Sequence, residues 1–175
     1  MLQPLRHDHP LRQMFSGTVQ HALYVDMGLC DPQLADYLTD LLSSLIHMDD
    51  IYPFHDATGR RLLSLAEWIT DAQIEPGVSP KQRERIIHRH IGDFSLFWTG
   101  LFPEGLRKLA HVGLGDAIDD FFRQGKRSYY IAAELTRDDD EPPADMLQRL
   151  SERFEYCVLG LNLCRKEWAG RLPGA

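Results

Sequence analysis

The sequence has little cysteine and no long hydrophobic run. Only three of its 175 residues are cysteines, and none belongs to a CxxC pair, which argues against both a disulfide framework and a zinc site. The longest apolar stretch, 91–102, is about twelve residues long and contains Asp93, whereas a membrane span needs about twenty apolar residues. The N-terminus also lacks the apolar core of a secretory signal. These absences predict a soluble, cytoplasmic protein.

Positive charge and catalytic motifs are scarce as well. The formal net charge is -7, which disfavours nucleic acid as a partner because phosphate contacts need a basic surface. The chain has no P-loop, GxGxxG, GxSxG or HExxH motif, and no pair of ExxH sequences for a di-metal bundle. The sequence therefore indicates neither a cofactor nor a metal. Two basic islands are local exceptions that could join into one basic face; their members are Arg83, Arg85, Arg89, Arg123, Lys126 and Arg127.

Amphipathic helices dominate what is present. Apolar residues recur at spacings of three and four, which is typical of helices with one buried face. The clearest starts are Asp31-Pro32 and Ser79-Pro80, each an N-cap residue followed by a proline suited to the first helical turn. The predicted helices cover 9–27, 31–48, 61–72, 79–101, 115–137 and 143–168.

These helices predict an all-α fold. We expect an antiparallel bundle of five or six helices in a single domain that spans 1–175, with an ordered core of about 9–169. Asp56 to Gly59 has the composition of a tight turn, so residues 51–63 could form a small hairpin. The last predicted helix carries an uninterrupted apolar seam made of Leu147, Leu150, Phe154, Cys157, Leu161, Cys164 and Trp168.

Asp93 lies in the most aromatic run of the chain, RHIGDFSLFWTGLFPE. At helical spacing it falls in a row with Ile86, His90 and Phe97 beside the apolar stripe, so we expect its carboxylate to be at least half buried. A buried carboxylate is costly unless it finds hydrogen bonds or a positive partner. His90 and Asp93 are about 60° apart around the helix, so their side chains can meet.

A further partner for Asp93 is expected in the segment GKRSYYIAAEL. Gly92 and Gly125 each lie in a helix interior, where glycine costs about 1 kcal/mol relative to alanine and is usually tolerated for a close approach. The two glycines therefore predict a close crossing of their helices. Such a crossing would pair Asp93 with Arg127 or Lys126.

Two interpretations of this crossing remain open. In the structural one, an ion pair and tyrosine hydroxyls satisfy each other and fix the register of the bundle. In the functional one, the same groups line a pocket for a small anionic ligand, with arginine as the fork for a carboxylate or phosphate. The candidate polar groups are His90, Asp93, Lys126, Arg127, Tyr129 and Tyr130.

Three sequence blocks carry a resemblance to known proteins. HIGDFSLFWTGLFPE, GKRSYYIA and LSERFEYCVLGL together resemble a family of bacterial helical proteins of unknown function. The resemblance covers about 9–168. It implies a bacterial, single-domain helical protein, and it implies no activity, cofactor or catalytic residue.

The sequence favours a non-enzymatic function. The absence of catalytic motifs, the acidic balance and the long 147–168 seam are typical of a protein that binds another protein or itself, with the seam extending into a dimer interface. The alternative is a bundle that binds a small anionic ligand or catalyses a reaction in a polar pocket between helices 79–101 and 115–137.

Overall fold

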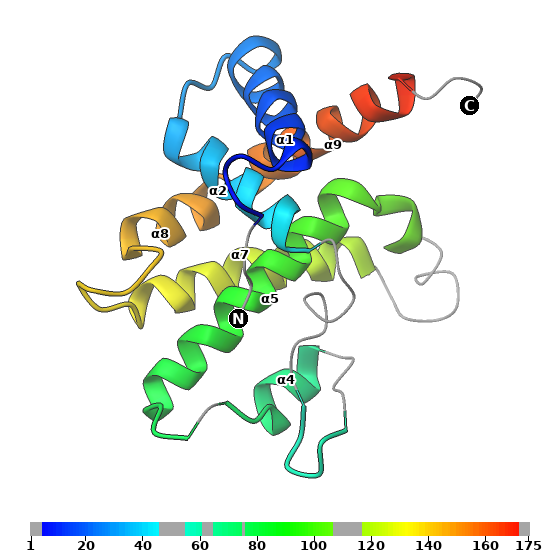
Figure 1. The fold of residues 1–175 in the computed structure, drawn as a ribbon. Coiled ribbons are helices and arrows are strands. Elements are labelled where there is room, and N and C mark those ends of the chain that lie inside the picture. Colours follow the sequence, from blue (N-terminus) through cyan, green and yellow to red (C-terminus); the bar gives the residue numbers. More distant parts are fainter. Residues whose placement is uncertain (1–4, 46–54, 61–64, 75, 107–116, 172–175) are drawn as a thin grey trace.

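The computed structural model describes residues 5–45, 55–60, 65–74, 76–106 and 117–171, and within these ranges the regular elements are helices (Figure 1). The all-α prediction is confirmed. Two of the six expected helices each appear as two segments, because the first continues into a π-helical turn and the last is interrupted. In chain order the elements are α1 (Pro10–Gln20), η1 (His21–Asp26), α2 (Pro32–Ser44), α4 (Leu65–Asp71), α5 (Pro80–Leu101), α7 (Ala117–Glu134), α8 (Ala144–Glu152) and α9 (Phe154–Arg171).

Helices α2 and α5 begin where the cap signals predicted. The Asp31 carboxylate accepts a 3.1 Å hydrogen bond from the backbone N–H of Leu34, and Ser79 Oγ accepts one of 3.2 Å from that of Gln82. Each cap satisfies a donor that the first helical turn would otherwise leave without a partner. Helix α2 ends at Ser44, and residues 46–48 of its predicted range lie outside the described residues.

The single helix predicted over 143–168 is wrong at Arg153, where α8 ends and α9 begins. Asp31 binds the junction from outside, accepting from Arg149 at 3.1 Å and from Arg153 at 3.4 Å. Ser151 adds a 2.8 Å hydrogen bond to the carbonyl of Lys126. The break takes up one residue, so the apolar spacing passes through it unchanged, and the seam stays buried at Leu147, Leu150, Phe154, Cys157, Leu161 and Cys164.

The predicted close crossing exists between α5 and α7, which run antiparallel in Figure 1. A Cβ at Gly92 would lie 2.7 Å from the Tyr129 ring, and one at Gly125 would lie 2.6 Å from the Phe154 ring. Only glycine therefore lets the two helices approach this closely while Tyr129 and Phe154 fill the space between them.

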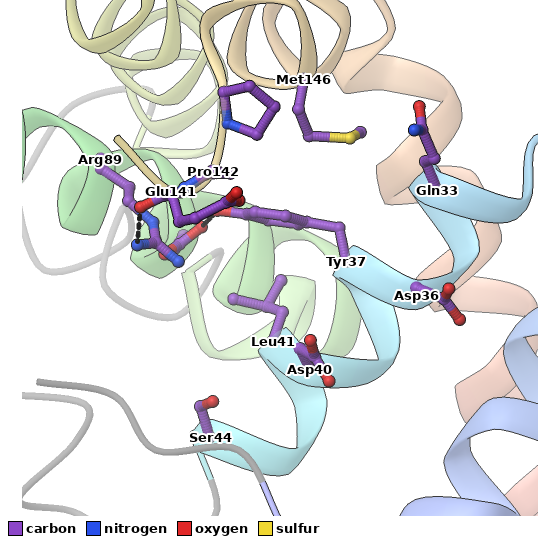
Figure 2. A pocket seen from close by; sticks show the side chains of 12 residues that line it. Gln33, Asp36, Tyr37, Asp40, Leu41, Ser44, Arg89, Glu141, Pro142 and Met146 are labelled. Carbon is purple, nitrogen blue, oxygen red and sulfur yellow. Dashed lines mark hydrogen bonds and ion pairs between the residues drawn. The ribbon is translucent and has the colours of Figure 1, made fainter. Parts of the chain in front are cut away.

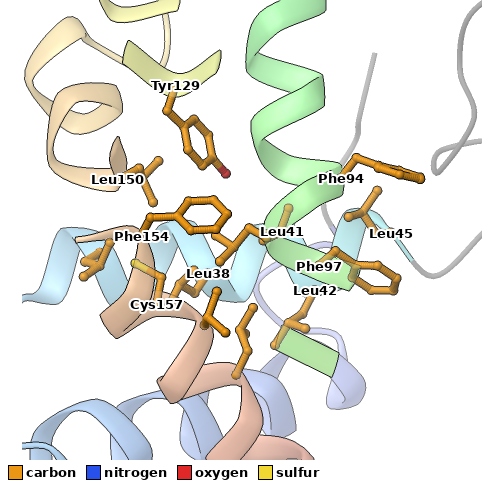
Figure 3. Close-up of a cluster of buried hydrophobic side chains, with 14 of the residues drawn as sticks. Leu38, Leu41, Leu42, Leu45, Phe94, Phe97, Tyr129, Leu150, Phe154 and Cys157 are labelled. Atoms are coloured by element: carbon orange, nitrogen blue, oxygen red, sulfur yellow. The ribbon is translucent and has the colours of Figure 1, made fainter. Parts of the chain in front are cut away.

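The core lies where α2, α5, α7 and α9 meet (Figure 3). Phe154 is fully buried, and its ring lies 6.1 Å from that of Tyr129 and 5.6 Å from that of Phe122. Leucines of α2, such as Leu38, close the core on the side of Phe154 that lies away from Tyr129. Tyr129 is thus a core residue whose ring position is fixed by packing, which also fixes where its hydroxyl points.

Helix α4 packs against one flank of α5, and a turn precedes it in the chain. The predicted turn is present: the N–H of Gly59 donates a 3.0 Å hydrogen bond to the carbonyl of Asp56. The arms of the expected hairpin, 51–54 and 61–64, lie outside the described residues. Trp68 of α4 is fully buried, with its ring 5.0 Å from that of Phe94.

Candidate functional site

A pocket of about 490 Å³ lies between α2, the middle of α5 and the segment that leads into α8 (Figure 2). Helix α2 supplies Tyr37, whose ring lies across the pocket in the view of Figure 2. Helix α5 supplies Arg89 and Asp93 from successive turns. Pro142 and Met146 close the side opposite α2.

Asp93 forms the floor of this pocket, with 2% of its surface exposed. Its Oδ1 accepts two short hydrogen bonds, at 2.6 Å from the hydroxyl of Tyr37 and at 2.7 Å from that of Tyr129. Its Oδ2 lies 3.8 Å from Arg89 Nε, one helical turn earlier. Side chains from α2, α5 and α7 thus converge on one carboxylate. They supply the hydrogen bonds and the positive charge that a buried carboxylate needs.

The two phenols at the floor are hydrogen-bond donors. Burial raises the pKa of Tyr37 and Tyr129 well above 10, and the negative charge of Asp93 raises both further. Both hydroxyls therefore keep their protons at neutral pH, and neither is available as a base or a nucleophile. The two phenols hold the Asp93 carboxylate in place, and neither of them is activated for proton transfer or nucleophilic attack.

Arg89 joins the floor to the wall of the pocket. Its guanidinium lies 5.9 Å from the centroid of the Tyr37 ring, a cation–π arrangement, and its Nη1 donates a 3.4 Å hydrogen bond to the carbonyl of Glu141. Arg85, one turn earlier, donates to the carbonyl of Pro142 at 3.0 Å and lies 3.5 Å from Asp140. Two arginines of α5 therefore hold the acid-rich segment that leads into α8.

The rim of the pocket carries excess negative charge. Among the described residues that line the pocket are four carboxylates and one guanidinium, that of Arg89. Asp93 is neutralised by Arg89, and Asp40 binds Arg12 at 2.6 Å. The other two acids, Asp36 and Glu141, are exposed at the rim, and among the described residues neither carboxylate has a salt bridge. Arg85 attracts Glu141 without forming a salt bridge with it. The described residues that line the pocket still carry more negative than positive charge, which makes its mouth electronegative.

The structure brings two of the predicted site residues together, Asp93 and Tyr129. The expected pairing of Asp93 with Arg127 or Lys126 is absent: Lys126 binds Glu155 at 2.8 Å, and Arg127 is exposed. The reason is the rotation of α7, which turns Tyr129 into the core and leaves Lys126 half-buried and Arg127 exposed. Tyr130, also in the predicted set, is 53% exposed.

The predicted location of the pocket also changes. The crossing of α5 and α7 is filled by the rings of Tyr129 and Phe154, so the described cavity lies on the α2 side of α5 instead. His90 is buried, and its ring lies 5.1 Å from that of Trp68 in α4. It therefore packs between α5 and α4.

The basic islands are engaged in local contacts. Arg83 donates to the carbonyl of Ala72 at 2.8 Å, and Arg123 binds Asp120 at 2.7 Å. Lys126 and Arg85 bind acids of the chain as described above. These pairings reduce the positive charge that a nucleic-acid face would need.

Of the described residues that line the pocket, only Asp93 was among the predicted site residues; Tyr37, Arg89 and Pro142 are three of those that sequence reasoning missed. Arg89 had a usable signal, since it precedes Asp93 by four residues and shares its helix face. Tyr37 and Pro142 had none, because they reach the site from segments far away in the sequence and no local pattern links them to Asp93.

Within the described ranges, no group of three or more histidine, cysteine, aspartate or glutamate side chains is placed to hold a metal ion. In the same ranges, none of the helices combines the length and apolar character needed to cross a membrane. No protein-family model, curated protein or solved structure matches the chain. The resemblance to bacterial helical proteins therefore stays a prediction.

Proposed function

We propose that the protein is a non-enzymatic binding protein whose pocket beside Tyr37 holds a small cationic ligand. The observation that carries this proposal is the pair of exposed carboxylates, Asp36 and Glu141, that have no salt bridge among the described residues and lie at the mouth of a cavity of about 490 Å³. The one lining guanidinium, Arg89, is already engaged by Asp93, Tyr37 and a backbone carbonyl. A cation is therefore favoured over the small anion that the sequence suggested.

The walls of the pocket restrict the rest of the ligand. Leu41, Met146 and the two prolines that precede α8 are apolar, and Tyr37 presents an aromatic ring. Small-molecule sites typically combine such apolar walls with a few polar groups that fix orientation. The ligand class is a protonated amine attached to a flat or aliphatic body.

The state of the floor supports binding over catalysis. Oδ1 of Asp93 accepts hydrogen bonds from Tyr37 and Tyr129, Oδ2 faces Arg89 at 3.8 Å, and the two phenols keep their protons at neutral pH. General acid–base catalysis needs a group whose pKa lies near the working pH and which reaches the substrate. Neither phenol is such a group, which favours a structural role for the floor in keeping the cavity open.

Two probes of similar size and opposite charge test the proposal. Calorimetric titration with 2-phenylethylammonium should give a measurable dissociation constant, and titration with 3-phenylpropanoate should give binding at least about tenfold weaker. Asp36→Asn and Glu141→Gln should each weaken binding of the ammonium. Asp119→Asn, which removes the same charge from the exposed first turn of α7, should leave it unchanged. Equal binding of the two probes, or equal effects of all three substitutions, would exclude a cation site here.

A further inference from the structure

Helix α9 is apolar on two opposite faces. Its inner face is the buried seam that includes Phe154, Cys157 and Leu161. Its outer face carries Tyr156, Leu159 and Leu163 at spacings of three and four, which places them along one stripe. A helix that is apolar on all sides is normally covered on all sides.

Among the described residues the outer stripe is covered only at Leu163, which packs against the hydrophobic core. Tyr156 is 58% exposed and Leu159 is 50% exposed, two of the largest exposures among the big apolar side chains, and Leu163 is half-buried. The inner seam, by contrast, is buried within the chain itself. It therefore cannot form the dimer interface that was expected from the 147–168 seam. A surface for a partner therefore has to be the outer stripe.

Charge along α9 indicates what fits this stripe. Glu155 of α9 and Glu152, the last residue of α8, lie at its N-terminal end, and Lys166 lies toward its C-terminal end. Glu155 already binds Lys126, whereas Lys166 is exposed and has no ion pair among the described residues. A second copy of the same helix, running the opposite way, presents its lysine to the acids of the first.

The alignment of two such helices follows from the spacing. When Leu159 of one copy faces Leu163 of the other, Tyr156 faces Lys166, because both pairs have the same midpoint along the helix. The Lys166 ammonium then lies over the tyrosine ring and within reach of Glu155, the residue before that tyrosine, and of Glu152 at the end of α8. A parallel alignment would instead bring like charges together.

We propose that the outer stripe of α9, Tyr156, Leu159 and Leu163, binds the same stripe of a second copy of this chain in an antiparallel, two-fold symmetric dimer. The contact is isologous, so each side supplies both the acids and the lysine. A stripe along a single helix of 18 residues gives an interface at the small end of specific interfaces, so the dimer is weak and depends on concentration. No residue of the stripe lines the pocket beside Tyr37. The proposed dimer therefore does not depend on the proposed ligand.

Sedimentation velocity on the full chain from about 5 to about 500 μM tests the proposal. The wild-type protein should shift from monomer toward dimer as the concentration rises. Leu159→Asp should weaken the association at least about tenfold. Ile69→Asp is the matched control, since Ile69 is 42% exposed on α4, which packs on α5. That variant should associate like the wild type.

A charge exchange tests the antiparallel arrangement and does not depend on the folding of the leucine variant. Lys166→Glu should weaken the dimer, and adding Glu152→Lys to it should restore association. A protein that stays monomeric at every concentration, or a dimer that Leu159→Asp leaves intact, overturns the proposal. Loss of association in both Leu159→Asp and Ile69→Asp also overturns it, because the stripe would then have no special part. Failure of the double variant to recover overturns the antiparallel alignment.

Discussion

The hydroxyl of Tyr129 donates a 2.7 Å hydrogen bond to Asp93. The ring of the same tyrosine lies against Gly92, the residue that precedes Asp93 in the chain. A single tyrosine thus fills the space that the glycine leaves and satisfies the acid next to it. Tyr37 completes the arrangement from α2. The packing of two helices and the floor of a pocket are therefore set by the same few atoms.

Replacing Asp93 by asparagine tests the importance of this floor for stability. Asparagine keeps an oxygen for the two hydroxyls but removes the charge that faces the mostly buried Arg89, so the free energy of unfolding should fall by about 3 kcal/mol. Urea denaturation gives the value. Asp120→Asn, which breaks the exposed pair with Arg123, should change it by about 0.5 kcal/mol or less. Equal effects of the two substitutions would contradict the assigned floor.

Alkaline pH should lower the free energy of unfolding because Tyr37 and Tyr129 are buried. Burial raises the pKa of both phenols in the folded state, whereas unfolded tyrosines lose their protons near pH 10. The unfolded state therefore binds fewer protons above pH 10, and stability that is fully present below this pH is lost as pH rises, by about 1.4 kcal/mol per pH unit for each tyrosine. Urea denaturation between about pH 9 and about pH 11 measures the slope, which Tyr37→Phe and Tyr129→Phe should each reduce. If neither substitution changes the dependence of stability on pH, the two buried tyrosines do not cause it.

The close crossing predicts opposite effects of alanine at two helical glycines. Gly92→Ala should destabilise the protein by about 2 kcal/mol or more, because the new Cβ would lie 2.7 Å from the buried Tyr129 ring. Gly17→Ala in α1 should stabilise it by about 0.5 to 1 kcal/mol, since a Cβ there meets nothing within 4 Å. Thermal and urea unfolding of the two variants compare the values directly. A tolerated alanine at position 92 would mean that α5 and α7 lie farther apart.

The three cysteines should differ in reactivity. Burial raises the pKa of both Cys157 and Cys164 to about 12, whereas Cys30 is exposed. Because the thiolate is the reactive form, the native protein should release about one equivalent of thionitrobenzoate from Ellman's reagent quickly, and about three after denaturation. Rapid reaction of more than one thiol in the native state would contradict the buried position of α9's inner face.

Local signals predicted the helices and their crossing well. Asp31-Pro32 and Ser79-Pro80 mark helix starts because a cap acts within one turn, and Gly92 marks a close approach because a helix interior otherwise disfavours glycine. The break at Arg153 could not be predicted, since the apolar spacing of the seam runs through it without change.

The candidate site was less predictable than the fold. The burial of Asp93 followed from its helix face, but its partners depended on how α7 is rotated and on which residue α2 presents. Tyr37 enters through the packing of α2 on α5, a relationship between distant segments that no local pattern contains. The acid-rich segment before α8 has no helical pattern, and it becomes a wall of the pocket because Arg85 and Arg89 bind its carbonyls.

The most direct test of a cation-binding pocket beside Tyr37 is a methyl NMR titration of protein labelled at its five methionines. Met146 lines the pocket and is 5% exposed, whereas Met14 is 40% exposed on α1 and is not among the pocket residues. On addition of 2-phenylethylammonium, the Met146 resonance should shift to saturation while that of Met14 stays in place, and 3-phenylpropanoate should move neither. Equal shifts of the two methionines, or a Met146 shift with the anion as large as with the cation, would contradict the account.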